Sequence, residues 1–173
     1  MNRILLPLFI LFVFISESTF TDLIELPFTS EDQVIIPRFV MLSIVFITAY
    51  YSQKMGIIYG MVFGLLHDIV YTEILGIYLF AYPLFAYLIS KALKALQGNM
   101  LVVLFLSLLA VTLLEFYSYG IQRLIGYSNL PFYDFTNLRL LPTILANSVG
   151  AIVLIYPMSR FISKVKRDYM DDL

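Results

Sequence analysis

The sequence has no cysteine and only one histidine, His67. Without cysteine, the chain forms no disulfide, holds no thiolate-bound metal, and offers no thiol nucleophile. A single histidine also disfavours a metal cluster. No nucleotide-binding loop, serine-hydrolase elbow, zinc-protease helix or nucleic-acid module occurs. We therefore predict a protein with no catalytic residues, no metal or other cofactor, and no nucleic-acid partner.

Charged residues are scarce as well, at 13% of 173 residues, whereas 61% are hydrophobic. Soluble domains average about 25% charged and about 45–50% apolar residues. The segment from Ala95 to Leu114 contains no ionisable side chain, and a bilayer core needs roughly 20 mostly apolar residues per helix. The composition predicts an all-α polytopic membrane protein, with residues 1–173 forming a single integral membrane domain.

The apolar runs predict six transmembrane helices and a short basic cytoplasmic tail over residues 162–173. The helices are expected over residues 3–20, 37–53, 55–70, 73–96, 99–121 and 138–161. The first run is alternatively a secretory signal, but its flank SESTF lacks a small-x-small cleavage site. Helices two and three are alternatively one long broken helix, because YSQKMG leaves almost no loop between them.

The distribution of basic residues favours six crossings with both termini in the cytoplasm. Eight of the 11 basic residues then lie inside, namely Arg3, Lys54, Lys91, Lys94, Arg160, Lys164, Lys166 and Arg167. The outer side receives Arg38, Arg123 and Arg139, together with a first loop that carries Glu17, Asp22, Glu25, Glu31 and Asp32. This asymmetry follows the positive-inside tendency of membrane proteins. Residues 20–36 and 122–137 are the two longer outer loops.

A stripe of small residues marks the third helix and its end. Gly56, Gly60, Gly64 and Asp68 are spaced by four, so they share one helix face. Small residues at this spacing allow a neighbouring backbone to approach closely in lipid. For Asp68 the simplest interpretation is a helix-end carboxylate that accepts hydrogen bonds from turn amides or a tyrosine, and the alternative is a carboxylate that binds a partner or ligand.

After this turn comes the stretch GIYLFAYPLFAYL, residues 76–88, which begins with Gly76 and carries two tyrosines one turn apart, Tyr78 and Tyr82. Pro83 removes a backbone donor there and shapes the helix. Together with the glycine stripe and Asp68, these residues form the predicted packing or partner face. His67 points about 100° away from Asp68 on the helix, so the two make a poor catalytic pair.

Two further polar groups are expected at membrane depth. Glu115 is predicted to form an ion pair with Arg123 or Arg139, with proton or substrate coupling as the alternative. Asn147 is predicted to form interhelical hydrogen bonds. At the chain's end, Arg160, Lys164, Lys166 and Arg167 are expected to anchor the last helix at anionic headgroups or to dock a cytoplasmic protein.

The stretch over residues 56–89 resembles the signature region of the MreD family of bacterial rod shape-determining membrane proteins. The matching positions are Gly60, Gly64, Leu65, Asp68, Leu75, Gly76 and Tyr82, and the stretch LPTILAN at the start of the last helix also agrees. The resemblance implies a non-catalytic scaffold of the cell-elongation (rod) complex in the bacterial cytoplasmic membrane. It implies partnership with the bitopic protein MreC, the actin-like MreB, and the glycosyltransferase RodA with its transpeptidase.

The same resemblance implies a fold similar to the substrate-binding subunits of energy-coupling-factor vitamin transporters, so such a subunit is the alternative function. The first helix, ILLPLFILFVFI, lacks the alanines that those subunits commonly present to their transducer, which favours the MreD family. A third hypothesis is a carboxylate-dependent enzyme or proton carrier that uses Glu115. Membrane lipids are expected partners, and the glycine stripe alternatively forms a homodimer or packs helices within one chain.

Overall fold

The computed structural model describes residues 4–23, 33–72 and 74–171, and every regular element within them is helical. The long helices are α1 (Leu5–Leu23), α2 (Phe39–Tyr50), α3 (Gln53–Tyr71), α4 (Ile77–Ala95), α5 (Met100–Leu124) and α7 (Leu141–Asp171). A short helix α6 (Phe132–Asp134) and a π-helix η1 (Phe135–Leu140) lead directly into α7. The predicted all-α fold with about six long helices is confirmed. The expected first-loop charges Glu25, Glu31 and Asp32, and Arg3, lie outside the described residues.

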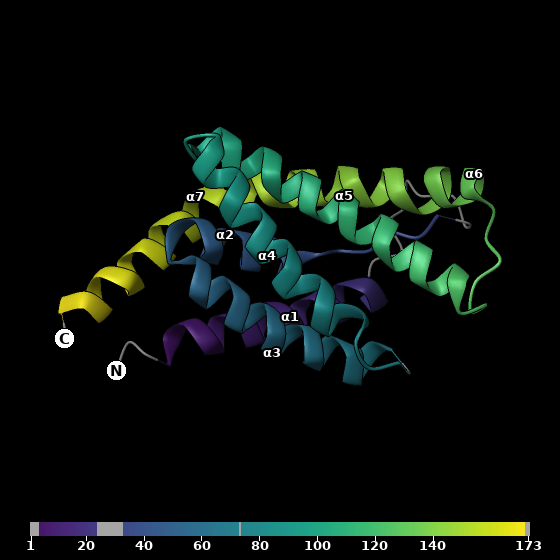
Figure 1. Ribbon diagram of the computed structural model, residues 1–173, viewed down its shortest axis with the longest axis horizontal. Helices are drawn as coiled ribbons and strands as arrows, with labels where there is room; N and C mark the ends of the chain where they lie inside the picture. Colours follow the sequence, from purple (N-terminus) through teal and green to yellow (C-terminus); the bar gives the residue numbers. More distant parts are fainter. Residues whose placement is uncertain (1–3, 24–32, 73, 172–173) are drawn as a thin grey trace.

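Among the described residues, three helical stretches are long and apolar enough to cross a membrane: Gln53–Tyr71, Met100–Leu124 and the continuous stretch Phe132–Met170. The helices run along one elongated bundle, and α1 begins at the end of the bundle where α7 finishes (Figure 1). The turns that join α2 to α3 and α4 to α5 lie at this same end.

Helix α2 is the centre of the bundle. It packs against α1, α3, α4, α5 and α7, and every residue from Val40 to Thr48 is buried. Its 12 residues span roughly 18 Å, whereas a bilayer core is about 30 Å thick. Residues 33–38 precede it in non-helical conformation, so this part of the chain needs hydrogen-bond partners from elsewhere.

Helices α2 and α3 are separate, which rules out one long broken helix. The chain leaves α2 at Tyr51, and the Ser52 side chain accepts a hydrogen bond from the Met55 backbone N–H at 3.2 Å. A serine at this position satisfies one of the free donors at a helix N-terminus. The short turn YS therefore both ends one helix and starts the next.

The glycine stripe of α3 faces neighbouring helices of the same chain. A Cβ atom at Gly56 would collide with the Thr48 side chain of α2. At Gly60 it would lie 2.9 Å from the Pro83 backbone nitrogen of α4, and at Gly64 it would collide with the Tyr78 carbonyl oxygen. The most extensive contact between described helices, that of α3 with α4, thus depends on the missing side chains.

The last helical stretch, which runs from α6 through η1 to the end of α7, is longer at both ends than the predicted range 138–161. Residues 132–137, expected as part of a loop, are helical because Pro131 starts the helix and Phe135 and the following Leu140 are buried. Residues 162–171, expected as a basic tail, continue α7 because Ile162 and Val165 pack in the core. The last part of α7 leaves the line of the first part (Figure 1), and Pro157 lies inside this helix.

Helix α4 begins four residues later than the predicted residue 73. Gly76 precedes the helix with a backbone φ of 112°, a conformation that glycine adopts without steric cost. Residues 74–76 therefore form a turn between α3 and α4.

We predict that Gly64→Ala destabilises the protein, since the added methyl group must displace the α4 backbone at Tyr78. Overpacking of this kind costs about 1–3 kcal/mol. Thermal unfolding in detergent should show a lower Tm for this variant. Gly120→Ala is the matched control, because a Cβ at Gly120 meets nothing within 4 Å; an equal loss in both variants would contradict the prediction.

Candidate functional site

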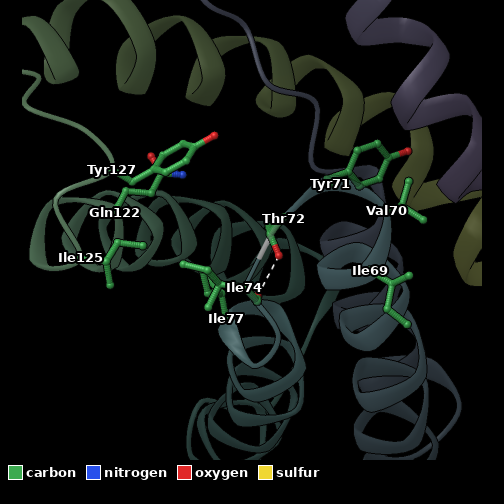
Figure 2. A pocket seen from close by; sticks show the side chains of 9 residues that line it. All are labelled: Ile69, Val70, Tyr71, Thr72, Ile74, Ile77, Gln122, Ile125 and Tyr127. Atoms are coloured by element: carbon green, nitrogen blue, oxygen red, sulfur yellow. Dashed lines mark hydrogen bonds between the residues drawn. The ribbon is translucent and has the colours of Figure 1, made fainter.

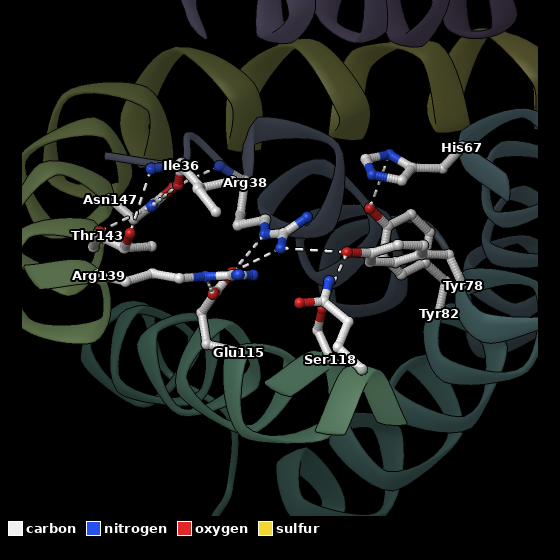
Figure 3. Close-up of polar contacts among 11 residues, drawn as sticks. Ile36, Arg38, His67, Tyr78, Tyr82, Glu115, Ser118, Arg139, Thr143 and Asn147 are labelled. Atoms are coloured by element: carbon white, nitrogen blue, oxygen red, sulfur yellow. Dashed lines mark hydrogen bonds and ion pairs between the residues drawn. The ribbon is translucent and has the colours of Figure 1, made fainter. Parts of the chain in front are cut away.

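Glu115, Arg38 and Arg139 form an ion-pair cluster in the interior of the bundle (Figure 3). Glu115 comes from α5 and is 0% exposed. Its Oε1 accepts from Arg38 Nε at 2.7 Å and lies 2.6 Å from Arg38 Nη2. Its Oε2 accepts from Arg139 Nε at 2.9 Å. One carboxylate therefore joins α5 to the segment before α2 and to η1.

The sequence named Arg139 and Arg123 as candidate partners of Glu115, and the structure selects Arg139. Arg123 Nη1 instead donates to the hydroxyl of Tyr119 on its own helix at 2.8 Å. Arg38 was not predicted to pair with Glu115. The signal for it was a lone basic residue between Pro37 and the apolar run FVMLSIVF, in a chain that otherwise avoids charge there.

Arg38 extends the ion-pair cluster toward α4 and α5. Its Nη2 donates to the Tyr78 hydroxyl at 3.2 Å, and its guanidinium carbon lies 5.3 Å from the centre of the Tyr78 ring. The Tyr78 hydroxyl also lies 3.3 Å from Ser118 Oγ. A buried charge is tolerated only when it is paired and hydrogen-bonded, and these contacts meet that requirement.

The non-helical segment before α2 is hydrogen-bonded to the start of the last helix. Asn147 Oδ1 accepts from the Arg38 backbone N–H at 2.8 Å, and Asn147 Nδ2 donates to the Ile36 carbonyl at 2.9 Å. Thr143 Oγ1 accepts from the Ile36 N–H, and the Leu138 carbonyl in η1 accepts from the Val34 N–H. Asn147 was predicted to form hydrogen bonds to a second helix. Its partners across the bundle lie instead in the non-helical segment before α2.

Glu17, from α1, stabilises the start of α2. Its Oε2 accepts from the Val40 backbone N–H at 2.8 Å, one of the free donors at a helix N-terminus. A carboxylate in this position also interacts favourably with the helix dipole. Non-helical backbone inside a membrane protein occurs only where protein groups satisfy it. Thr143 and Asn147 supply such groups for Ile36 and Arg38, and Glu17 supplies one for the first turn of α2.

Asp68 caps the start of α4. Its two carboxylate oxygens accept hydrogen bonds from the backbone N–H groups of Gly76, Tyr78 and Leu79 at 2.8, 2.8 and 3.0 Å. Asp68 is 0% exposed, and its carboxylate forms its hydrogen bonds with this turn instead of with solvent. These contacts correspond to the helix-end interpretation of Asp68.

His67 and the two tyrosines of α4 form an aromatic group beside the ion-pair cluster. His67 Nδ1 lies 3.4 Å from the Tyr82 hydroxyl, and the His67 and Tyr78 ring centres are 4.1 Å apart. Figure 3 shows His67 directed toward the tyrosines of α4. Tyr82 is fully buried and Tyr78 is 5% exposed, so both face the interior of the chain.

A cavity of about 380 Å³ lies beside the ion-pair cluster, and we call it the polar cavity. It is lined by Glu17, Ser18, Val34, Ile36, Pro37, Arg38, His67, Tyr71, Thr72, Tyr78, Gln122 and Arg139. A second cavity of about 370 Å³ lies between the ends of α3 and α5 (Figure 2) and shares Tyr71, Thr72 and Gln122 with it. The buried charges thus border a space large enough for a small molecule.

The basic residues near the chain's end lie on the surface of α7. Arg160, Lys164 and Arg167 are exposed and Lys166 is half-buried. The Arg160 guanidinium lies 4.5 Å from the ring centre of Tyr156. Within the described part of the chain, no three histidine, aspartate or glutamate side chains gather in a metal-binding arrangement.

These features define a class: an all-helical membrane protein whose buried carboxylates join separate segments of the bundle. Residues 2–165 match the family model of the rod shape-determining protein MreD. The chain is also 45% identical over 172 residues to the rod shape-determining protein MreD of Bacillus subtilis strain 168, covering 99% of this chain and 100% of that protein. The chain belongs to the MreD family.

Family membership confirms the resemblance found in the sequence and gives the chain a role in bacterial cell shape. No solved structure matches the chain. The expected similarity to the substrate-binding subunits of vitamin transporters therefore has no structural support.

We predict that Glu115→Gln lowers the free energy of unfolding by about 3–5 kcal/mol, because it leaves the buried Arg38 without its counter-charge. Denaturant titration of the purified protein in detergent measures this loss. Asp134→Asn is the matched control, since it removes the same charge from a partly exposed position in α6. Equal midpoints for Glu115→Gln and the unaltered protein would refute a structural role for the ion-pair cluster.

Proposed function

We propose that the chain is a non-catalytic scaffold of the bacterial rod complex. In this proposal it binds the bitopic protein MreC and, with MreB, RodA and the transpeptidase partner, organises lateral peptidoglycan synthesis. The observation that carries the proposal is the match to the MreD family over residues 2–165, together with 45% identity to a rod shape-determining protein along its full length.

The hydrogen bonds of the buried carboxylates support a scaffold. Glu115 holds two arginines, Asp68 holds the first amides of α4, and Glu17 holds the first amides of α2. Each carboxylate connects two segments of the bundle. This arrangement fits a protein that presents a fixed helical surface to other proteins.

We also propose that the chain crosses the cytoplasmic membrane several times with both termini in the cytoplasm. The start of α1 and the end of α7 lie at one end of the bundle (Figure 1). Lys54 at the start of α3, Lys91 and Lys94 at the end of α4, and the basic residues of α7 belong to that same end. An excess of lysine and arginine on one side is typical of the cytoplasmic face.

Reporter fusions test this topology. We expect a cytoplasm-active reporter to work when fused to either end of the chain, and a periplasm- or exterior-active reporter to fail at both ends. A fusion inserted after Tyr127, in the turn between α5 and α6, should give the opposite pattern. Two ends in different compartments would exclude the proposed topology.

Depletion and rescue test the scaffold function in a rod-shaped bacterium that lacks its own MreD-family protein. We expect the unaltered chain to restore rod shape and to co-purify with the bitopic partner. Glu115→Gln should lose both in proportion to its loss of folded protein, whereas Asp134→Asn should retain both. Rescue of shape without any recovery of the partner would contradict the proposed mode of action.

A further inference from the structure

The polar cavity has the dimensions and the lining of a binding site. Its volume of about 380 Å³ lies in the range of small-molecule pockets, about 300–1,000 Å³. Arg38 and Arg139 border one part of it, and Val34, Ile36 and Pro37 border another. The cavity therefore combines two guanidinium groups and the Glu17 carboxylate with apolar walls.

Arg139 lines this cavity and has guanidinium nitrogens that are free to donate further hydrogen bonds. Its Nε donates to Glu115, while its Nη1 and Nη2 have no hydrogen-bond partner among the residues that the structure describes. The side chain is 17% exposed, compared with 3% for Arg38. Figure 3 shows the Arg139 guanidinium reaching from η1 toward that of Arg38.

The local charge is positive on the side of the cavity formed by the ion-pair cluster. Two guanidinium groups share the single carboxylate of Glu115. Glu17 also borders the cavity, but it is only 5% exposed and its Oε2 is bonded to the start of α2. The charge that the cavity presents to an incoming molecule is therefore mainly that of Arg139.

We propose that the polar cavity binds the phosphate group of an organic anion, with the terminal nitrogens of Arg139 as its main contact. A guanidinium matches a phosphate through two parallel N–H···O bonds. The Gln122 amide and the Ser18 hydroxyl are neutral polar groups of the same lining, and they surround the anion with further polar atoms. The apolar part of the lining accommodates the organic part of the molecule.

The phosphate belongs either to a lipid headgroup or to a water-soluble phosphate ester. An apolar groove of about 440 Å³ lies between α1 and α7, and it shares Pro37 with the polar cavity. Phe9, Phe12 and Val153 are among the side chains that line this groove. A lipid with its headgroup in the polar cavity has a path for an acyl chain there, whereas a soluble ester needs only the cavity.

Native mass spectrometry of the purified full chain tests the proposal. The probes are phosphatidylglycerol and its deacylated, water-soluble headgroup glycerophosphoglycerol. Their phosphate-free counterparts, diacylglycerol and diglycerol, are the controls. Retention of phosphatidylglycerol alone identifies a lipid, and retention of the soluble headgroup alone identifies a soluble ester; either result, or both, supports the site. No preference for the phosphate-bearing probes overturns it.

Variants place the binding in the polar cavity. Arg139→Gln should weaken retention of the phosphate-bearing probe by at least about tenfold, the effect of losing one charge-assisted contact. Arg123→Gln is the matched control, because it removes the same charge from an arginine outside the cavity; retention should change by less than about twofold. Equal losses in both variants would assign the binding to surface charge and overturn the proposal.

A second variant keeps the test decisive if Arg139→Gln fails to fold. Gln122→Glu leaves the Arg139–Glu115 ion pair in place and adds a negative charge to the cavity lining. It should also weaken retention by at least about tenfold, while Gln122→Met, which adds no charge, should weaken it much less. Full retention of the probe by folded Gln122→Glu would rule out the polar cavity as the binding site.

Discussion

The pairing of Glu115 with two arginines is the interaction on which the rest of the structure depends. A charge buried in a lipid-dissolved bundle is costly unless an opposite charge lies against it. Glu115 therefore fixes the position of both partners, Arg38 and Arg139. Arg38 immediately precedes α2, and Arg139 lies in η1, which leads directly into α7, so the ion pairs fix the chain where two of the helices begin. Because Glu115 belongs to α5, the same ion pairs also fix the position of α5 relative to these two segments.

This arrangement also sets where α2 begins, and α2, with 12 residues, is the shortest of the six main helices. The chain approaches it in extended form, and that segment finds its hydrogen-bond partners in η1 and α7. A π-helix is uncommon and often lies at functional sites; here it contains Arg139 and the carbonyl that receives Val34 N–H. The polar cavity lies beside this segment, and Val34, Ile36, Pro37 and Arg38 belong to its lining.

The glycine stripe decides which surfaces remain for other molecules. Because Gly56, Gly60 and Gly64 lie against α2 and α4 of the same chain, that face is already occupied. Large apolar side chains on the outer faces of the helices, such as Phe80, Phe105 and Leu145, are more than half exposed. These outer faces remain exposed, whereas the interior face of α3 packs against the chain's own helices and stabilises the protein.

The sequence by itself determined the all-helical character, the number of long helices, the family and the close packing allowed by the glycines. These properties follow from local composition and from spacing by four, which a single helix displays without its neighbours. Only the tertiary structure decided that Glu115 pairs with Arg38, that Asn147 binds an extended segment, and that residues 162–171 remain helical. Such contacts join residues as far apart as Arg38 and Asn147, so their geometry depends on how all the helices pack. The polar cavity has the same origin, because its lining comes from six separate parts of the chain and no local pattern brings them together.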